Sequence, residues 1–275
     1  MNYYMSRVEI DEIGEGLIRA YANKFSNRAI QSVDIEHFIM EFLRLGIEYT
    51  SFAEMDAGKI GFLADGKTPL LIHQDGKIIP FVFPKDTIVL DKFLLSEREQ
   101  GRRRFTMAHE AAHYILGKVY AIPSAGCFHT EYDGERSYSK EELAQMFASA
   151  EWQADVMGAS LLMPRYIVDN ALAKFNRSNP IKIYGGNTIT ARDKDIIRRM
   201  AASIGVSYTA LFIRLRDLEM FEYHDILEYI SNELNEKAKK QGISGRTMRD
   251  VRSRMKNELE YQVNEKQENS IRLKE

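Results

Sequence analysis

The sequence has little cysteine and no long apolar run. Its single cysteine, Cys127, cannot form an intramolecular disulfide, which excludes the small secreted domains that depend on disulfides. The best candidate for a membrane span, residues 77–89, is interrupted by two prolines and Asp86, and it is shorter than the ~18 apolar residues that a span needs. Residues 1–16 carry acidic side chains where a signal peptide needs an apolar core. We therefore expect a cytoplasmic protein without a membrane segment.

The sequence also lacks an excess of charge of either sign. Its 38 lysine and arginine residues are balanced by 40 aspartate and glutamate residues, which gives a net charge of −2. This balance excludes the basic surface that a dedicated nucleic-acid-binding protein carries. Two local basic runs remain, at residues 102–104 and 246–256. Such runs are usually solvated helix faces. The alternative is a substrate clamp for residues 102–104 and a contact with phosphate or with an acidic partner for residues 246–256.

The first part of the chain predicts an α+β fold. Apolar residues at helical spacing predict helices over 11–25 and 34–45. Residues 46–91 change to short alternating runs separated by turn dipeptides, which predicts a small, mostly antiparallel sheet. Asp75-Gly76 is placed at the tip of a hairpin, because both positions of a tight hairpin turn favour such residues.

Two capping boxes predict the helices that follow. Ser96 and Glu99 have the spacing of the first, which predicts a helix running up to the irregular stretch 117–139. A second box beginning at Ser139 predicts a helix over 140–163. The irregular stretch between them is long enough to be a functional loop.

The most informative motif lies inside the first of these helices. His109-Glu110-Ala111-Ala112-His113 places two imidazoles on one helix face, where both can bind one metal ion. In this arrangement the two histidines hold zinc and the glutamate acts as a base toward water. The alternative is that both histidines are core residues bonded to backbone carbonyls.

A third ligand is expected from the next helix. Glu151 and Asp155 are four residues apart, beside a stripe of small residues that would let the two helices pack closely. Glu151 is then placed to reach the metal, while Asp155 accepts the outward N–H of a histidine ligand. The alternative is an ordinary surface or capping role for both carboxylates.

Together these motifs resemble the ImmA/IrrE family of zinc metallopeptidases, which are gluzincin-like zincins. The resemblance covers residues 33–164 and rests on FTMAHEAAHYILG followed by EWQADVMGASLLMP. It implies that His109, His113 and Glu151 bind Zn²⁺ and that Glu110 is the catalytic base. Asp155 lies where the family often has Asn or Asp. The stretch between the two motifs is longer than in a minimal family member.

The resemblance also implies a reaction and a substrate class. Peptide-bond hydrolysis would use zinc to lower the pKa of water from 15.7 toward about 7, with Glu110 taking the proton. The family cleaves helix-turn-helix transcriptional repressors in mobile-element or stress responses, so a protein of that kind is the expected partner. Several residues are candidates for the additional donor to the oxyanion, and the sequence does not rank them: Tyr114, His129, Tyr132 and Tyr184.

The rest of the chain predicts a second, smaller module. We expect a zincin-like domain over 1–176, an all-helical, helix-turn-helix-like module over 177–232, and a charged helical or partly disordered tail over 233–275. A glycine turn at Gly205 followed by Ser207 is typical of a helix-turn-helix. The helix after it offers Arg214 and Arg216 among apolar residues, which favours packing over base reading.

Three hypotheses about function follow from these features. The preferred one is a zinc endopeptidase. The second is a DNA-binding regulator with a structural or idle zinc site, and an intact Glu110 argues against it because a structural site needs no base. The third is a module that sequesters a repressor without cutting it. Cys127, close to His129, is also a conceivable latch on the open metal position, although a lone cysteine usually has no such role.

Overall fold

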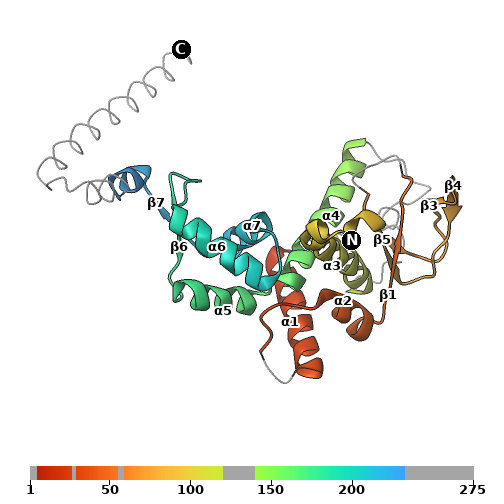
Figure 1. Ribbon diagram of the computed structural model, residues 1–275, viewed down its shortest axis with the longest axis horizontal. Helices are drawn as coiled ribbons and strands as arrows, with labels where there is room; N and C mark the ends of the chain where they lie inside the picture. Colours follow the sequence, from red (N-terminus) through yellow and green to blue (C-terminus); the bar gives the residue numbers. More distant parts are fainter. Residues whose placement is uncertain (1–4, 27–28, 55–58, 120–139, 233–275) are drawn as a thin grey trace, which may run out of the picture. The chain divides into compact units, whose positions relative to one another are not determined.

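The computed structural model describes residues 5–26, 29–54, 59–119 and 140–232 of the chain (Figure 1). The chain divides into two compact units. The first comprises Met1–Asn179 and Ile196–Glu219, and the second comprises Pro180–Asp195 and Met220–Glu275. The fold is α+β, as the sequence predicts. The domain boundaries drawn from the sequence stay a prediction.

Helix α1, Arg7–Phe25, begins one turn earlier than the apolar pattern predicts. The Ser6 side chain accepts the backbone N–H of Glu9, and the Glu9 carboxylate accepts the backbone N–H of Ser6. This reciprocal capping box satisfies N–H groups that would otherwise have no partner in the first turn. The buried face of the helix consists of Ile10, Gly14, Ile18 and Tyr21.

The helix predicted over 34–45 is shorter and irregular. Asp34 caps α2, Ile35–His37, by accepting the backbone N–H of His37. The chain then continues as a π-helical turn, Phe38–Phe42. Phe38 and Ile39 are fully buried in this turn, so the wider helix still delivers its apolar side chains to the core.

Five strands follow, in two small sheets. The first sheet has the order β1-β5-β2, with β1 at Gly46–Thr50, β5 at Thr87–Asp91 and β2 at Gly61–Ala64. Strand β5 is central and pairs with β1 in parallel and with β2 antiparallel. The second sheet is the antiparallel hairpin of β3, Leu70–Gln74, and β4, Lys77–Phe81. Two of the three pairings in these sheets are antiparallel, as predicted, but β1 and β5 are parallel. The direction of that pair depends on how two distant segments meet, which local sequence patterns do not indicate.

The hairpin turn lies at Asp75-Gly76, as predicted. Both residues have positive φ, at 50° for Asp75 and 73° for Gly76, as the favoured two-residue hairpin turn requires. The hairpin contributes Leu70 and Ile72 to a buried cluster with Phe83 and two residues of the first sheet, Ala64 and Val89.

The predicted capping box at Ser96 is absent. Two short 3-10 turns, Lys92–Leu95 and Glu97–Glu99, precede helix α3, Gln100–Val119, and the Ser96 side chain makes no capping hydrogen bond. The spacing of the box is correct, but the 3-10 turns separate Ser96 from the start of the helix. Helix α3 also continues two residues beyond the predicted end at residue 117.

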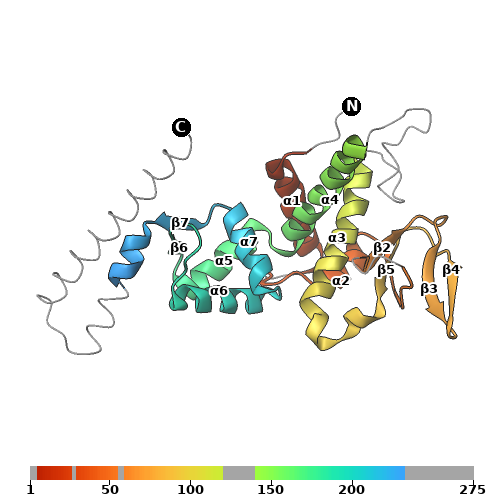
Figure 2. The same cartoon turned by 90° about the horizontal axis from the view of Figure 1, so that it is seen from above.

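Helix α4, Lys140–Leu162, packs along α3 and also along α1 (Figure 2). It ends just before Pro164, and α5, Arg165–Asn176, follows directly. The contact with α1 is close, because a Cβ at Gly14 would lie 2.5 Å from Ser160 Oγ. Three helices therefore form one packed layer, with α4 in contact with both of the others.

Two further helices belong to the later part of the chain. Helix α6, Ala191–Ile204, and helix α7, Tyr208–Asp217, are bent by 102° relative to each other. Gly205, with φ at 79°, makes the turn, and the Ser207 side chain accepts the backbone N–H of Ala210. The predicted glycine turn and serine cap are therefore present. Within the described residues no single helix is both long and apolar enough to cross a membrane, and α6 with α7 reaches that composition only as a bent pair.

The segment predicted to be all-helical also contains strands. Strands β6, Ile181–Tyr184, and β7, Phe221–His224, pair in parallel within the second unit. Each has only four residues, which is too short for the alternating pattern to stand out from a buried helix end. Gly185 and Gly186 directly follow β6, and both have positive φ.

Candidate metal centre

Two histidines of α3 face the same point. His109 and His113 lie one helical turn apart, and their Nε2 atoms are 3.0 Å from each other. His113 is buried, and the side chain of His109 is 17% exposed. Their ring nitrogens converge as two ligands of one ion would.

Glu151 of α4 completes this group. Its Oε2 lies 3.1 Å from His109 Nε2, and its Oε1 lies 3.4 Å from His113 Nε2. One donor atom from each of the three residues lies within 4.8 Å of the others, which is close enough for a shared metal ion. In the described part of the chain no other group of three such side chains meets this condition. We call these three residues the ligand triad.

A glycine of α4 allows the two helices to approach. A Cβ placed on Gly158 would lie 3.2 Å from the backbone nitrogen of His109. This contact is with backbone, which cannot move aside, so a side chain at Gly158 would push α4 away from α3. Glycine is therefore needed here for space, and the close packing of the helices brings Glu151 within reach of the histidines.

Asp155 holds His109 from the other side. The Nδ1–H of His109 donates to Asp155 Oδ1 over 2.9 Å. This hydrogen bond fixes the ring orientation and leaves the Nε2 lone pair directed at the ligand triad. The structure therefore brings Asp155 to the position that the sequence suggested for it.

The electrostatics of the triad favour a positive charge. Burial by itself would lower the pKa of His109, but hydrogen bonds to Asp155 and Glu151 raise it to about 9. Burial would raise the pKa of Glu151, but hydrogen bonds from His109 and His113 lower it to about 2. In the metal-free chain a proton supplies this positive charge. A cation that binds the triad must displace that proton, so metal binding releases protons.

Glu110 lies next to the triad in an apolar setting. It is 8% exposed, and desolvation raises the pKa of its carboxyl above the ordinary value, while the charges of His113 and His109 oppose this rise. The backbone N–H of Leu63, on β2, donates to the carboxylate. A buried carboxyl with a raised pKa is suited to accept and return a proton near neutral pH.

Two imidazole nitrogens and one carboxylate form a donor set that fits zinc. Catalytic zinc sites use three protein ligands of this kind and keep a fourth position open for water or substrate. Calcium and magnesium prefer oxygen ligands, so the two histidines argue against them. The chain therefore offers a suitable set of ligands for zinc, with an acid–base group beside it.

Comparison with known proteins agrees with this geometry. Residues 92–216 match the peptidase M78 family, described as the IrrE N-terminal-like domain. The matched region includes the ligand triad, Glu110 and Asp155, and it continues past residue 176, where the sequence predicts a domain boundary. No curated protein matches the chain.

The hydrogen bond from His109 to Asp155 leads to a prediction about metal affinity. Replacing Asp155 by asparagine removes the charge that holds the His109 N–H, and zinc affinity is expected to fall by about 10–100-fold. Competition with a chromophoric chelator measures this change. Asp169→Asn on the following helix is the control, because Asp169 lies outside the triad, and it should leave zinc affinity unchanged. Equal affinities of the wild type and Asp155→Asn would contradict the prediction.

The arginines that the sequence singled out have separate environments. Arg102 is exposed and lies near Glu99, whereas Arg104 donates to the carbonyl of Val33. The run 102–104 is therefore not one basic surface. Arg214 of α7 is buried, with its side chain 1% exposed, so it is not available to contact DNA.

Several other candidates have no part in the metal centre. His37 lies 3.1 Å from the Tyr21 hydroxyl, His73 is exposed on β3, and His224 pairs with Glu222 and Glu228. Other residues and segments for which the sequence made predictions lie outside the described residues: Cys127, His129, Tyr132, Ser139, residues 120–139, and residues 233–275 with the basic run 246–256.

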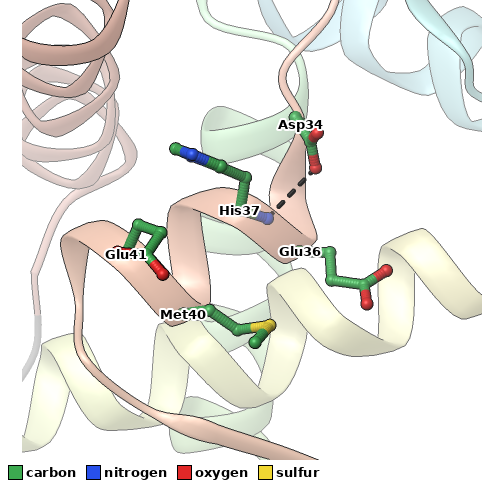
Figure 3. A pocket seen from close by; sticks show the side chains of 5 residues that line it. All are labelled: Asp34, Glu36, His37, Met40 and Glu41. Carbon is green, nitrogen blue, oxygen red and sulfur yellow. Dashed lines mark hydrogen bonds between the residues drawn. The ribbon is translucent and has the colours of Figure 1, made fainter.

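A hollow on the first unit is acidic but does not resemble a metal site. It is lined by Asp34, Glu36, His37, Met40 and Glu41 (Figure 3). The side chains spread in different directions around α2 and the π-helical turn. One of the carboxylates, that of Asp34, is engaged in capping α2. No catalytic group follows from this arrangement.

Sequence reasoning missed the part of the site that β2 contributes. Gly61 and the backbone of Leu63 both contact Glu110, although they are far from the motif in sequence. A glycine inside a short apolar strand was the available signal, because such a glycine often marks a close approach of another group.

Proposed function

We propose that the chain is a zinc-dependent endopeptidase with Glu110 as its general base. The single observation that carries the proposal is the convergence of His109, His113 and Glu151 beside the buried carboxyl of Glu110. A purely structural site would need a closed set of four ligands and no base. The match to the peptidase M78 family supports the same reaction class.

The chemistry follows from the position of each group. A bound zinc ion would supply Lewis acidity, lowering the pKa of water and polarising the substrate carbonyl. Glu110 accepts the proton as water attacks the carbonyl carbon, and it then returns this proton to the leaving amine nitrogen. Asp155 keeps the His109 ring in the tautomer that leaves Nε2 unprotonated.

The edge of β2 supports a polypeptide as the substrate. In the described residues β2 is an edge strand, with β5 as its sheet neighbour on one side. Apart from the N–H of Leu63, which Glu110 uses, backbone groups of this strand edge can bind an extended peptide as an additional strand. Because β2 contacts Glu110, such a peptide would pass close to the ligand triad.

The substrate that we propose is a helix-turn-helix transcriptional repressor in the cytoplasm. The resemblance to the ImmA/IrrE family is the basis for this choice. The alternative is a regulator that binds DNA or sequesters a repressor without cutting it. The burial of Arg214 argues against DNA binding through α7. Helix α7 carries two arginines, and only Arg216 is exposed.

Metal removal tests the proposed reaction. The purified chain, loaded with zinc and incubated with a small helix-turn-helix protein encoded beside it, is expected to produce a single cut that mass spectrometry locates. Dialysis against a chelator should abolish cleavage, and added zinc should restore it. The chelated protein without added zinc is the control. Cleavage that persists after complete metal removal would rule out a zinc peptidase.

A further inference from the structure

The backbone of β2 presses on the side chain of Glu110. A Cβ placed on Gly61 would lie 2.6 Å from Glu110 Oε1 and 2.6 Å from Thr106 Cγ2. These distances are shorter than real Cβ contacts. Gly61 is not among the glycines with positive φ in the described chain. Glycine is therefore required at this position for space and not for backbone conformation.

The strand register explains why β2 can also donate to Glu110. Ile60 and Ala64 direct their carbonyl groups at β5, where they accept the N–H groups of Asp91 and Asp86. Because these directions alternate along an antiparallel strand, the N–H and carbonyl groups of residues 61 and 63 point away from β5. The N–H of Leu63 is therefore not used for pairing with β5. A backbone hydrogen bond from Leu63 is one of the effects that oppose the rise in the pKa of Glu110, which burial dominates.

We propose that Gly61 and the backbone N–H of Leu63 form a positioning element for the general base Glu110. This inference rests on the proposed function. The N–H of Leu63 holds the carboxylate, and the missing side chain of Gly61 leaves the space that this carboxylate occupies. Neither residue touches the substrate carbonyl in this role, because both act through Glu110.

The proposal separates the position of the base from metal binding. The three atoms nearest to a Cβ at Gly61 belong to Glu110 and Thr106 and not to the ligand triad. A methyl group at Gly61 should therefore displace the base while leaving the metal ligands in place. A displacement of about 1 Å at a catalytic group can lower a rate by about 100-fold.

The first test is a thermal unfolding cycle on metal-free protein. Gly61→Ala is expected to lower Tm by about 5 °C, because overpacking strains the core. In a Glu110→Ala background the same substitution should lower Tm much less, because the clashing carboxylate is gone. Gly46→Ala on β1 is the matched control: the three atoms nearest to its Cβ would all belong to Thr87, so its effect on Tm should be equal in both backgrounds. If Gly61→Ala lowered Tm equally in both backgrounds, the proposal would be overturned.

The second test measures catalysis and metal binding in the zinc-loaded protein. Gly61→Ala is expected to lower kcat by about 100-fold, with KM and zinc affinity changed less than about twofold. Adding Thr106→Ser removes the Cγ2 clash but not the Glu110 clash. The double variant should therefore regain part of the lost Tm without regaining kcat. Recovery of kcat in the double variant would show a general packing effect and overturn the proposal.

The Leu63 N–H is tested by a pair of substitutions at the same position. Leu63→Ala and Leu63→Pro both shorten a buried side chain, but only proline removes the N–H. Proline is tolerable here because this N–H points away from β5. We expect kcat of Leu63→Pro to be at least about tenfold below that of Leu63→Ala, in line with the loss of one hydrogen bond to a charged group. Equal kcat values would count against this half of the proposal.

The cleavage assay and the metal-free unfolding cycle distinguish a failure of the proposed function from a failure of the proposed positioning role. A wild-type protein that cleaves no substrate would contradict the proposed function, while the metal-free unfolding cycle would still report whether Gly61 and Glu110 interact. Conversely, a fully active enzyme whose Gly61→Ala variant keeps its kcat would contradict the positioning role and leave the peptidase assignment standing.

Discussion

Replacing Glu110 by glutamine is expected to lower kcat by about 10³-fold or more while zinc affinity stays within about threefold. Glutamine keeps the size of the side chain and can still accept the N–H of Leu63, but its amide cannot take a proton from water. The ligand triad consists of other residues and remains intact. Single-turnover cleavage and zinc titration of the same preparation measure the two quantities separately.

The Glu110→Gln variant also separates the three hypotheses about function. Glu97→Gln serves as the control, because Glu97 is an exposed acid just before α3, and it should leave kcat unchanged. A peptidase that acts by cutting its partner loses its biological effect in Glu110→Gln but still binds that partner. A full biological effect in this variant would instead point to sequestration or to a DNA-binding regulator.

Replacing Arg214 by methionine is expected to destabilise the protein by about 3 kcal/mol, because it breaks a buried ion pair and leaves its partner uncompensated. Arg214 Nη1 donates to Asp11 of α1 over 2.8 Å, and its Nε donates to the carbonyl of Met163, just after α4, over 3.0 Å. One side chain therefore joins α7 to α1 and to the end of α4. Tm should fall by about 9 °C, which differential scanning calorimetry measures.

Arg216 provides the matched control for Arg214. It lies two residues further along α7, and its side chain is 57% exposed. Arg216→Met should change Tm by less than about 2 °C, because surface substitutions have small effects on stability. A destabilised Arg214→Met with unchanged DNA affinity would fit a packing role. If Arg214→Met kept its stability but lost affinity for DNA, the helix-turn-helix would have to be reinterpreted as a DNA reader.

The helices of the site could be predicted from the sequence because their signals are local. The spacing of His109 and His113 requires a helix to bring them together, and Pro164 ends the helix that carries Glu151. The hairpin turn at Asp75-Gly76 was predictable for the same reason, because both residues favour positive φ. The capping box at Ser96 failed although its spacing was correct. A capping pattern in the sequence therefore does not guarantee a capping hydrogen bond, because neighbouring turns can separate the serine from the start of the helix.

Contacts between distant segments could not be predicted in the same way. The parallel pairing of β1 with β5 and of β6 with β7 depends on how remote segments meet. The apolar neighbours of Arg214 favoured packing over base reading, but its partner Asp11 is 203 residues away in sequence. Nothing near Arg214 in the sequence identifies that partner.

The sequence by itself predicted the types and spacing of the metal-binding side chains and the residue proposed as the base, because a helix repeat places His109 and His113 on one face. Only the tertiary structure decided that Glu151 reaches them, since that depends on the close approach of two helices at Gly158. The tertiary structure also decided how Glu110 is held. Its neighbours on β2 come from a strand almost 50 residues earlier, and their role depends on strand register and on the absence of one side chain.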